Sequence, residues 1–203
     1  MAITTYSELQ TAVGRWMQRD DLSAMIPDFI ANAEAEFNRV LRLTGQLVRV
    51  DLDVSARWTD LSVALAAPAA EIRSISCTTG GRRYALEYLT PDEAQAYTYS
   101  GAPRYYTRSG DELGILPPPD GTYTLELIYW RAVPALAVAS TNFLLTLAPD
   151  LYLYRSVLEG AQFVQDGDLI ARVGPMYDRA MTQIQRDDKR RQFGGSNLRM
   201  RAA

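Results

Sequence analysis

The chain has 203 residues, of which 47% are hydrophobic and 22% are charged, and its formal net charge is −3. This length allows one large domain or two small ones, and the composition is that of ordinary globular proteins, which excludes an intrinsically disordered chain. There is no histidine and only one cysteine, Cys77, which excludes histidine-dependent catalysis, internal disulfides and the usual zinc sites.

Membrane insertion and secretion are not indicated. No run approaches the roughly 18 consecutive apolar residues of a membrane-spanning helix. The first residues lack the positive region and apolar run of a secretory signal. We therefore expect a protein that is made in the cytoplasm, has no membrane partner and needs no cofactor.

The first 44 residues are predicted to form two helices. Thr5-Tyr6-Ser7-Glu8 has the spacing of a capping box, which predicts a helix from Tyr6 to about Arg19. Pro27 suits the first turn of a second helix, which should run to about Leu43. Apolar residues recur every four positions along it, which indicates one buried face.

The period of the apolar residues changes to two after Gly45, as is typical of half-buried strands. The predicted strands cover residues 48–54, 57–65, 72–77, 82–86, 104–108, 113–116 and 123–131. Gly80-Gly81 predicts a hairpin turn, and Thr90-Pro91-Asp92-Glu93 predicts a short helix to about Tyr97. Together these segments predict an antiparallel β domain.

The last third of the chain returns to a helical pattern. Asn142 can cap a short turn, and Pro149 can begin a helix that runs to about Val164. Apolar residues cover nearly every side of this helix, which is typical of a bundle core or a subunit interface. The residues that carry this prediction are Leu151, Tyr152, Tyr154 and Leu158.

A further helix follows a turn at Asp166-Gly167-Asp168. Its apolar stripe consists of Leu169, Val173, Met176, Ala180 and Ile184. Gly174-Pro175 predicts a kink within it.

The predicted fold class is α+β. A four-helix bundle is expected from residues 1–44 and 142–192, because neither pair of helices has enough partners to bury its stripes alone. The antiparallel β domain should be an insertion over residues 45–141, and residues 193–203 should form a flexible basic tail.

The segment from Arg186 to Ala203 carries six positive and two negative charges, a net charge of +4. A solvated tail without a partner, nucleic-acid binding and docking on an acidic protein surface are all consistent with it. The candidate docking residues are Arg186, Lys189, Arg190, Arg191, Phe193, Leu198, Arg199, Met200 and Arg201.

Two other patterns leave functional alternatives open. Asp51 with Asp53, and Asp166 with Asp168, could bind calcium or act as acid and base, but neither pair has further ligands nearby in the sequence. We therefore predict no catalytic, cofactor or metal site, although a carboxylate enzyme using Asp51, Asp53 and Glu87 is one alternative. Clustered tyrosines give another, a binding module that recognises carbohydrate or nucleic acid through a tyrosine-rich sheet.

Three stretches resemble the head-tail adaptor, or connector, family of tailed bacteriophages, which is related to tail tubular protein A. The first runs from Thr5-Tyr6-Ser7-Glu8 through Arg19-Asp20-Asp21-Leu22 to Ile26-Pro27-Asp28-Phe29-Ile30 and Ala33-Glu34. The others are Tyr129 to Leu136, and Asn142-Phe143-Leu144-Leu145 followed by Ala148-Pro149-Asp150-Leu151-Tyr152 and Leu158-Glu159-Gly160-Ala161.

This resemblance implies a structural virion protein and no catalysis. It implies a dodecameric ring in the neck between capsid and tail, in which the C-terminal segment docks on the portal protein. The ring would extend the channel through which DNA passes without sequence-specific binding, and it would give tail or nozzle proteins a platform.

Overall fold

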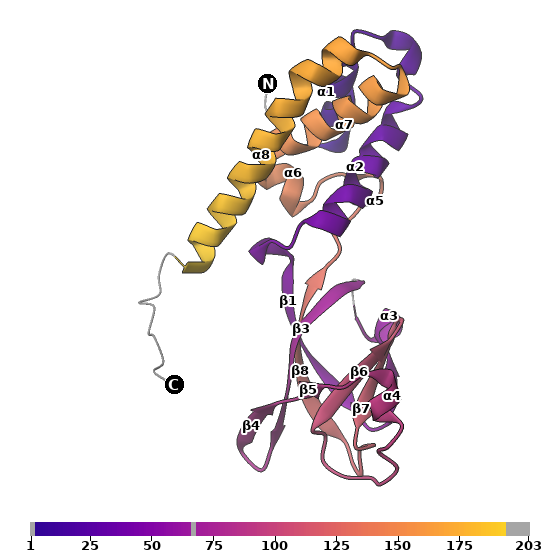
Figure 1. Ribbon diagram of the computed structural model, residues 1–203, viewed down its shortest axis with the longest axis vertical. Helices are drawn as coiled ribbons and strands as arrows, with labels where there is room; N and C mark the ends of the chain where they lie inside the picture. Colours follow the sequence, from indigo (N-terminus) through magenta and orange to yellow (C-terminus); the bar gives the residue numbers. More distant parts are fainter. Residues whose placement is uncertain (1–2, 66–67, 194–203) are drawn as a thin grey trace. The chain divides into compact units, whose positions relative to one another are not determined.

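The computed structural model describes residues 3–65 and 68–193, and the chain divides into two compact units. Residues 1–45 and 133–203 belong to the first, here called the helical unit, and residues 46–132 form the second, the β unit (Figure 1). Helices in one unit and largely antiparallel sheets in the other confirm the α+β fold class.

The helical unit is built from four longer helices and two short ones. Their bounds are α1 (Tyr6–Met17), α2 (Ile26–Val40), α5 (Leu136–Ala139), α6 (Phe143–Leu147), α7 (Pro149–Phe163) and α8 (Gly167–Phe193). Short 3-10 helices cover Asp20–Leu22 and Thr44–Gln46. Helix α1 begins with the predicted capping box, in which the Glu8 N–H donates to Thr5 Oγ1 at 3.3 Å and the Thr5 N–H donates to Glu8 Oε2 at 3.1 Å.

Helix α7 is the central element of this unit, because it packs against α1, α2, α6 and α8. Leu151, Tyr152 and Val157 on α7 are fully buried in one core with residues of the surrounding helices. A Cβ at Gly160 would lie 2.5 Å from the thioether of Met17, so α1 and α7 approach closely there. Most apolar residues of α7 are therefore covered by this chain's own helices, but Phe163 at its C-terminal end is 56% exposed.

The boundary between the units lies earlier than the predicted end of the β domain at residue 141. The Val133 N–H donates to Asn38 Oδ1 at 2.6 Å, and the Leu136 N–H donates to Glu34 Oε1 at 2.8 Å. Leu136 is fully buried in the core of the helical unit. These contacts with α2 draw residues 133–141 into the helical unit.

The stripe predicted for α8 is correct at four of its five positions. Leu169, Val173, Ala180 and Ile184 are buried, but Met176 is 40% exposed. Tyr177 packs against the core in its place, and its hydroxyl donates to Glu36 Oε1 of α2 at 2.6 Å. Pro175 lies within α8, which is one helix on both sides of it.

The β unit consists of two four-stranded sheets around one core. The first has the order β1-β8-β3-β4 and the second has the order β2-β7-β6-β5. The strands are β1 (Leu47–Val54), β2 (Trp58–Asp60), β3 (Ala69–Thr79), β4 (Arg82–Ala85), β5 (Glu87–Tyr88), β6 (Tyr105–Ser109), β7 (Glu112–Leu116) and β8 (Tyr123–Arg131). The core between the sheets includes Ile75, Cys77, Leu113, Leu125 and Leu127.

Most strands of the β unit match the predicted segments, but β3 is longer than predicted, β5 was not predicted, and two further regions differ. The strand predicted over residues 57–65 ends at Asp60, whose carboxylate accepts from the Ser62 N–H at 2.8 Å and begins a helical turn, α3 (Leu61–Ala64). Helix α4 (Pro91–Ala94) has the predicted capping box but ends three residues early. The short pair β5–β6 is parallel, whereas all other paired strands of the described residues are antiparallel.

Replacement of Gly114 by alanine should destabilise the β unit. A Cβ at this position would lie 2.6 Å from Trp58 Cζ3 and 2.7 Å from Thr107 Cγ2. The partly exposed Trp58 ring can shift, but Thr107 is fully buried, so we expect a loss of ~1–3 kcal/mol in unfolding free energy. Urea unfolding followed by tryptophan fluorescence measures it. Gly121→Ala is the matched control, because no atom lies within 4 Å of its added Cβ, and an equal loss there would contradict the packing argument.

Candidate assembly surface

The predicted docking residues that the structure describes lie on the last turns of α8. Arg186, Lys189, Arg190 and Arg191 are all exposed there. Spacings of three and four residues place Arg186, Lys189 and Arg190 on one side of the helix. Phe193 is the last helical residue, and Leu198, Arg199, Met200 and Arg201 lie outside the described residues.

The same side of α8 is basic further toward its N-terminal end, which the sequence prediction missed. Arg172 and Arg179 are exposed and precede Arg186 at intervals of seven residues, or about two helical turns. The basic face of α8, as we call Arg172, Arg179, Arg186, Lys189 and Arg190, therefore extends over most of the helix. Seven-residue spacing in the sequence is the signal that could have revealed it.

The C-terminal half of α8 is fixed to the helical unit by a buried carboxylate. Asp188 is buried, and its Oδ1 accepts from the Thr44 N–H at 2.9 Å while its Oδ2 accepts from Gln192 Nε2 at 2.9 Å. Ile184 is buried one turn earlier. Residues 186–192 are thus part of the folded unit, so a deletion that starts at Arg186 would remove a core contact and could not test docking alone.

The four α7 residues predicted for a bundle core or a subunit interface contact other parts of the helical unit. Leu151, Tyr152 and Leu158 are buried, and Tyr154 is partly buried. The Tyr154 ring lies edge-on to Trp16 of α1, with centroids 5.7 Å apart. These residues therefore pack against other parts of the same chain, and Leu151 and Tyr152 are fully buried there.

A buried polar network joins α2, α7 and the segment before α6. Tyr152 donates weakly to Glu34 Oε1 at 3.4 Å and accepts from Asn142 Nδ2 at 2.7 Å. Asn142 Oδ1 also caps α6 by accepting from the Leu145 N–H at 2.8 Å. Burial raises the pKa of the Glu34 carboxyl above its ordinary value, although the hydrogen bonds from Leu136 and Tyr152 oppose this shift.

Glu34→Gln should remove a pH dependence of stability. Because the folded-state pKa of Glu34 is raised, the folded protein binds this proton more tightly than the unfolded chain, and stability falls as pH rises from about 4.5 through the raised pKa. Glutamine keeps an acceptor for the Leu136 N–H without a charge. Urea unfolding should show that the unfolding free energy of the variant, relative to that of the native protein, is higher at pH 7 than at pH 4. Equal pH dependence of the two unfolding free energies would contradict this.

A second polar network holds α8 against α2 and α7. Arg155 Nε lies 2.6 Å from Glu36 Oε2, and the Arg155 guanidinium also pairs with Glu159. Tyr177 of α8 donates to Glu36 Oε1 at 2.6 Å, and burial followed by this bond raises the tyrosine pKa. The two carboxylates are thus engaged in helix packing.

The carboxylate pairs singled out in the sequence have structural surroundings. Asp51 and Asp53 are exposed on one face of β1, and Asp53 Oδ1 accepts from Thr124 Oγ1 at 2.6 Å. Asp166 Oδ1 accepts from the Leu169 N–H at 2.9 Å, next to Asp168 in the first turn of α8. Within residues 3–65 and 68–193, no three histidine, cysteine, aspartate or glutamate side chains are grouped so that they could hold a metal ion.

The clustered tyrosines lie on β5, β6 and the loop between α4 and β6. The rings of Tyr97 and Tyr105 have centroids 5.3 Å apart, and those of Tyr88 and Tyr106 are 5.5 Å apart. The rings are tilted or edge-on to one another, so they pack together and do not form a row of parallel faces for stacking.

Among the helices that the structure describes, none is long and apolar enough to cross a membrane.

Comparison with known protein families gives a match over nearly the whole chain. The model of the family described as SU10 adaptor protein matches residues 4–201. No curated protein matches the sequence.

Proposed function

The chain belongs to the SU10 adaptor protein family, a bacteriophage adaptor family, and from that premise we propose that it forms a ring that docks on the portal protein. As a member of this family it is a structural component of the virion that interacts with other virion proteins. The finer proposal places the ring, a dodecamer, in the neck between capsid and tail. There it extends the DNA channel and gives tail proteins a platform.

The family match over residues 4–201 is the observation that carries this proposal. The basic face of α8 supports a docking role, because its five cations are exposed along one side of a helix. A protein partner with an acidic surface would attract this face, and the attraction would weaken as salt screens the charges. The hydrogen bond from the Thr44 N–H to the Asp188 carboxylate holds the last turns of α8 to the helical unit. The cations on these turns are therefore presented in a defined geometry.

Mixing the purified chain with the portal protein of the same virion tests the proposal. Native mass spectrometry of the mixture should give one complex that contains twelve copies of each chain, and electron images should show one ring stacked on another. A portal that keeps its own mass at every ratio of the two proteins would overturn the docking role. A complex with another number of copies would overturn the dodecamer and leave docking in place.

A further inference from the structure

The first sheet of the β unit has two free edges. Its order is β1-β8-β3-β4, so β1 and β4 are the outer strands, and every neighbouring pair in it is antiparallel (Figure 1). Among the described residues, neither β1 nor β4 has a backbone hydrogen bond to a further strand on its outer side. Unpaired N–H and C=O groups on such edges can pair with a strand of another chain.

Strand β1 is an unusually open edge. All eight residues from Leu47 to Val54 pair with β8 in continuous register. It contains no proline, lysine or β-bulge, which are common features that prevent edge strands from pairing with other molecules. The side chains on its exposed face are Arg49, Asp51 and Asp53, so the end of the edge toward Val54 is acidic.

Strand β4 has the opposite charge. It carries Arg82 and Arg83, both exposed. A groove of about 530 Å³ borders it, and Arg104 lies with these two arginines in the lining of that groove. Solvent therefore reaches β4, and its surroundings are basic.

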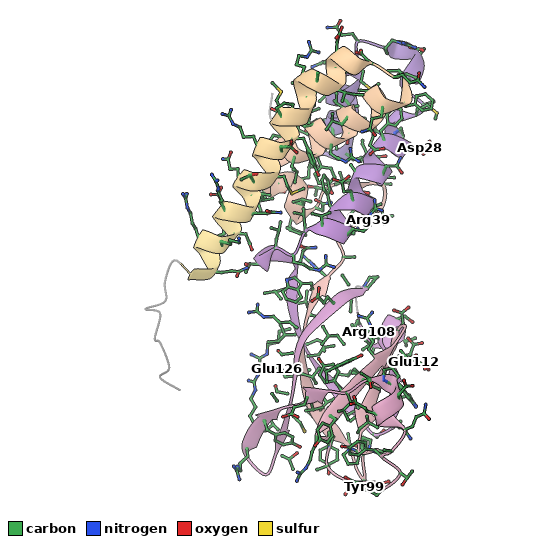
Figure 2. The ribbon with its side chains drawn as sticks, viewed as in Figure 1. Asp28, Arg39, Tyr99, Arg108, Glu112 and Glu126 are labelled. Atoms are coloured by element: carbon green, nitrogen blue, oxygen red, sulfur yellow. The ribbon has the colours of Figure 1, made fainter. Side chains whose placement is uncertain are left out.

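The register of the sheet places the opposite charges in corresponding positions. Asp53 of β1 pairs with Thr124 of β8, and Thr78 of β3 pairs with Arg83 of β4. Because Cys77 pairs with Leu125 in antiparallel register, Thr78 lies opposite Thr124 and joins the two pairs into one row. The exposed face of one cross-strand row thus begins at Asp53 and ends at Arg83. Glu126, labelled in Figure 2, lies on the same face and pairs with Arg49 and Arg83.

We infer that β4 of one copy pairs with β1 of the next copy, so that the first sheet continues from subunit to subunit. Strand directions alternate across the sheet, so a β1 strand added beside β4 continues the antiparallel order. In unshifted register Arg83 of one copy would face Asp53 of its neighbour, a cross-strand pair of opposite charge. The contact joins two different edges head to tail, which is the type of interface that closes into rings.

This inference rests on the proposed ring and names the surfaces through which the copies meet. Strand β4 has only four residues, so one contact is short and of limited strength. Like charges at either edge would prevent pairing, which gives the contact its direction: β1 should not pair with β1, nor β4 with β4.

Two charge-reversed variants and their mixture test the inference. Asp51→Arg/Asp53→Arg makes both edges basic, and Arg82→Asp/Arg83→Asp makes both acidic. Each variant alone should lose ring formation on the portal, as measured by native mass spectrometry. An equimolar mixture should recover it, because alternating copies restore opposite charges at every contact. The matched control Asp92→Arg/Glu112→Arg, at two exposed carboxylates of the same unit, should assemble like the native chain.

The outcomes separate the inference from the proposed function. If the native chain forms a ring on the portal and both variants do so equally well, the sheet-edge contact is wrong and the adaptor role stands. If both variants fail and their equimolar mixture does not recover assembly, the pairing of β1 with β4 is also overturned. If the native chain itself does not join the portal, the proposed function fails and the inference fails with it.

Discussion

Arg186→Glu/Arg190→Glu is expected to weaken portal binding by at least about 30-fold, since each reversal replaces an attraction of about 1 kcal/mol with a repulsion. Both side chains are exposed on α8, and the ion pair of Arg190 with Asp187, at 3.7 Å on the surface, adds little to folding. The fold should therefore persist while the basic face of α8 loses most of its positive charge. Titration of the variant against the portal protein at two salt concentrations measures both the affinity and its screening.

The matched control for this variant is Arg19→Glu/Arg39→Glu. These two arginines are exposed on the same unit but do not belong to α8, and Arg39 is labelled in Figure 2. An equal loss of binding in the control would mean that net charge, and not the basic face, sets the affinity. A chain that ends at Phe193 leaves all described contacts in place, so its affinity for the portal isolates the contribution of residues 194–203.

Local chemistry explains which elements could be predicted from the sequence. Thr5 and Glu8, or Thr90 and Glu93, are three residues apart and bond to each other's backbone, so their spacing alone indicates where the helices begin. Asn142 caps α6 in the same way. The alternation along β8 likewise reflects one buried and one more exposed face of a single strand.

One missed element depends on a local cap, and another depends on contacts far apart in the sequence. Leu61-Ser62-Val63-Ala64 alternates like a strand, but the Asp60 carboxylate bonds the Ser62 N–H and starts a helical turn. Residues 133–141 follow a strand and precede a helix cap, and only their bonds to Asn38 and Glu34 assign them to the helical unit. Partners about 100 residues away leave no periodic signal in a single sequence.

The candidate surfaces likewise divide into one that local sequence predicts and one that depends on long-range contacts. The basic residues at the end of α8 were visible as a charged segment, and their continuation to Arg172 follows from helical spacing. By contrast, the free edges of β1 and β4 depend on strand order, because β8 pairs with β1 from about 70 to 80 residues away. The excess of apolar residues on α7 predicted a bundle core or a subunit interface, and α1, α2, α6 and α8 pack against this helix within one chain while Phe163 stays exposed.

Tyr152→Ala is expected to be the most destabilising single substitution in the helical unit, with a loss of ~3–5 kcal/mol in unfolding free energy. The ring is fully buried and lies edge-on to Phe37, with centroids 5.0 Å apart. Truncation would leave a cavity and would also deprive Asn142 Nδ2 and Glu34 of a buried partner. Urea unfolding followed by circular dichroism at 222 nm measures the loss, since that signal comes mainly from the helical unit.

Tyr152→Phe separates the two parts of this effect. Phenylalanine keeps the ring and its contact with Phe37, and it removes only the hydroxyl that joins Asn142 to Glu34, so a loss of ~1–2 kcal/mol is expected. If Tyr152→Phe costs as much as Tyr152→Ala, the hydrogen-bond network and not the packing of the ring stabilises α7. If neither substitution changes the unfolding midpoint, α7 is not the element around which the helical unit folds.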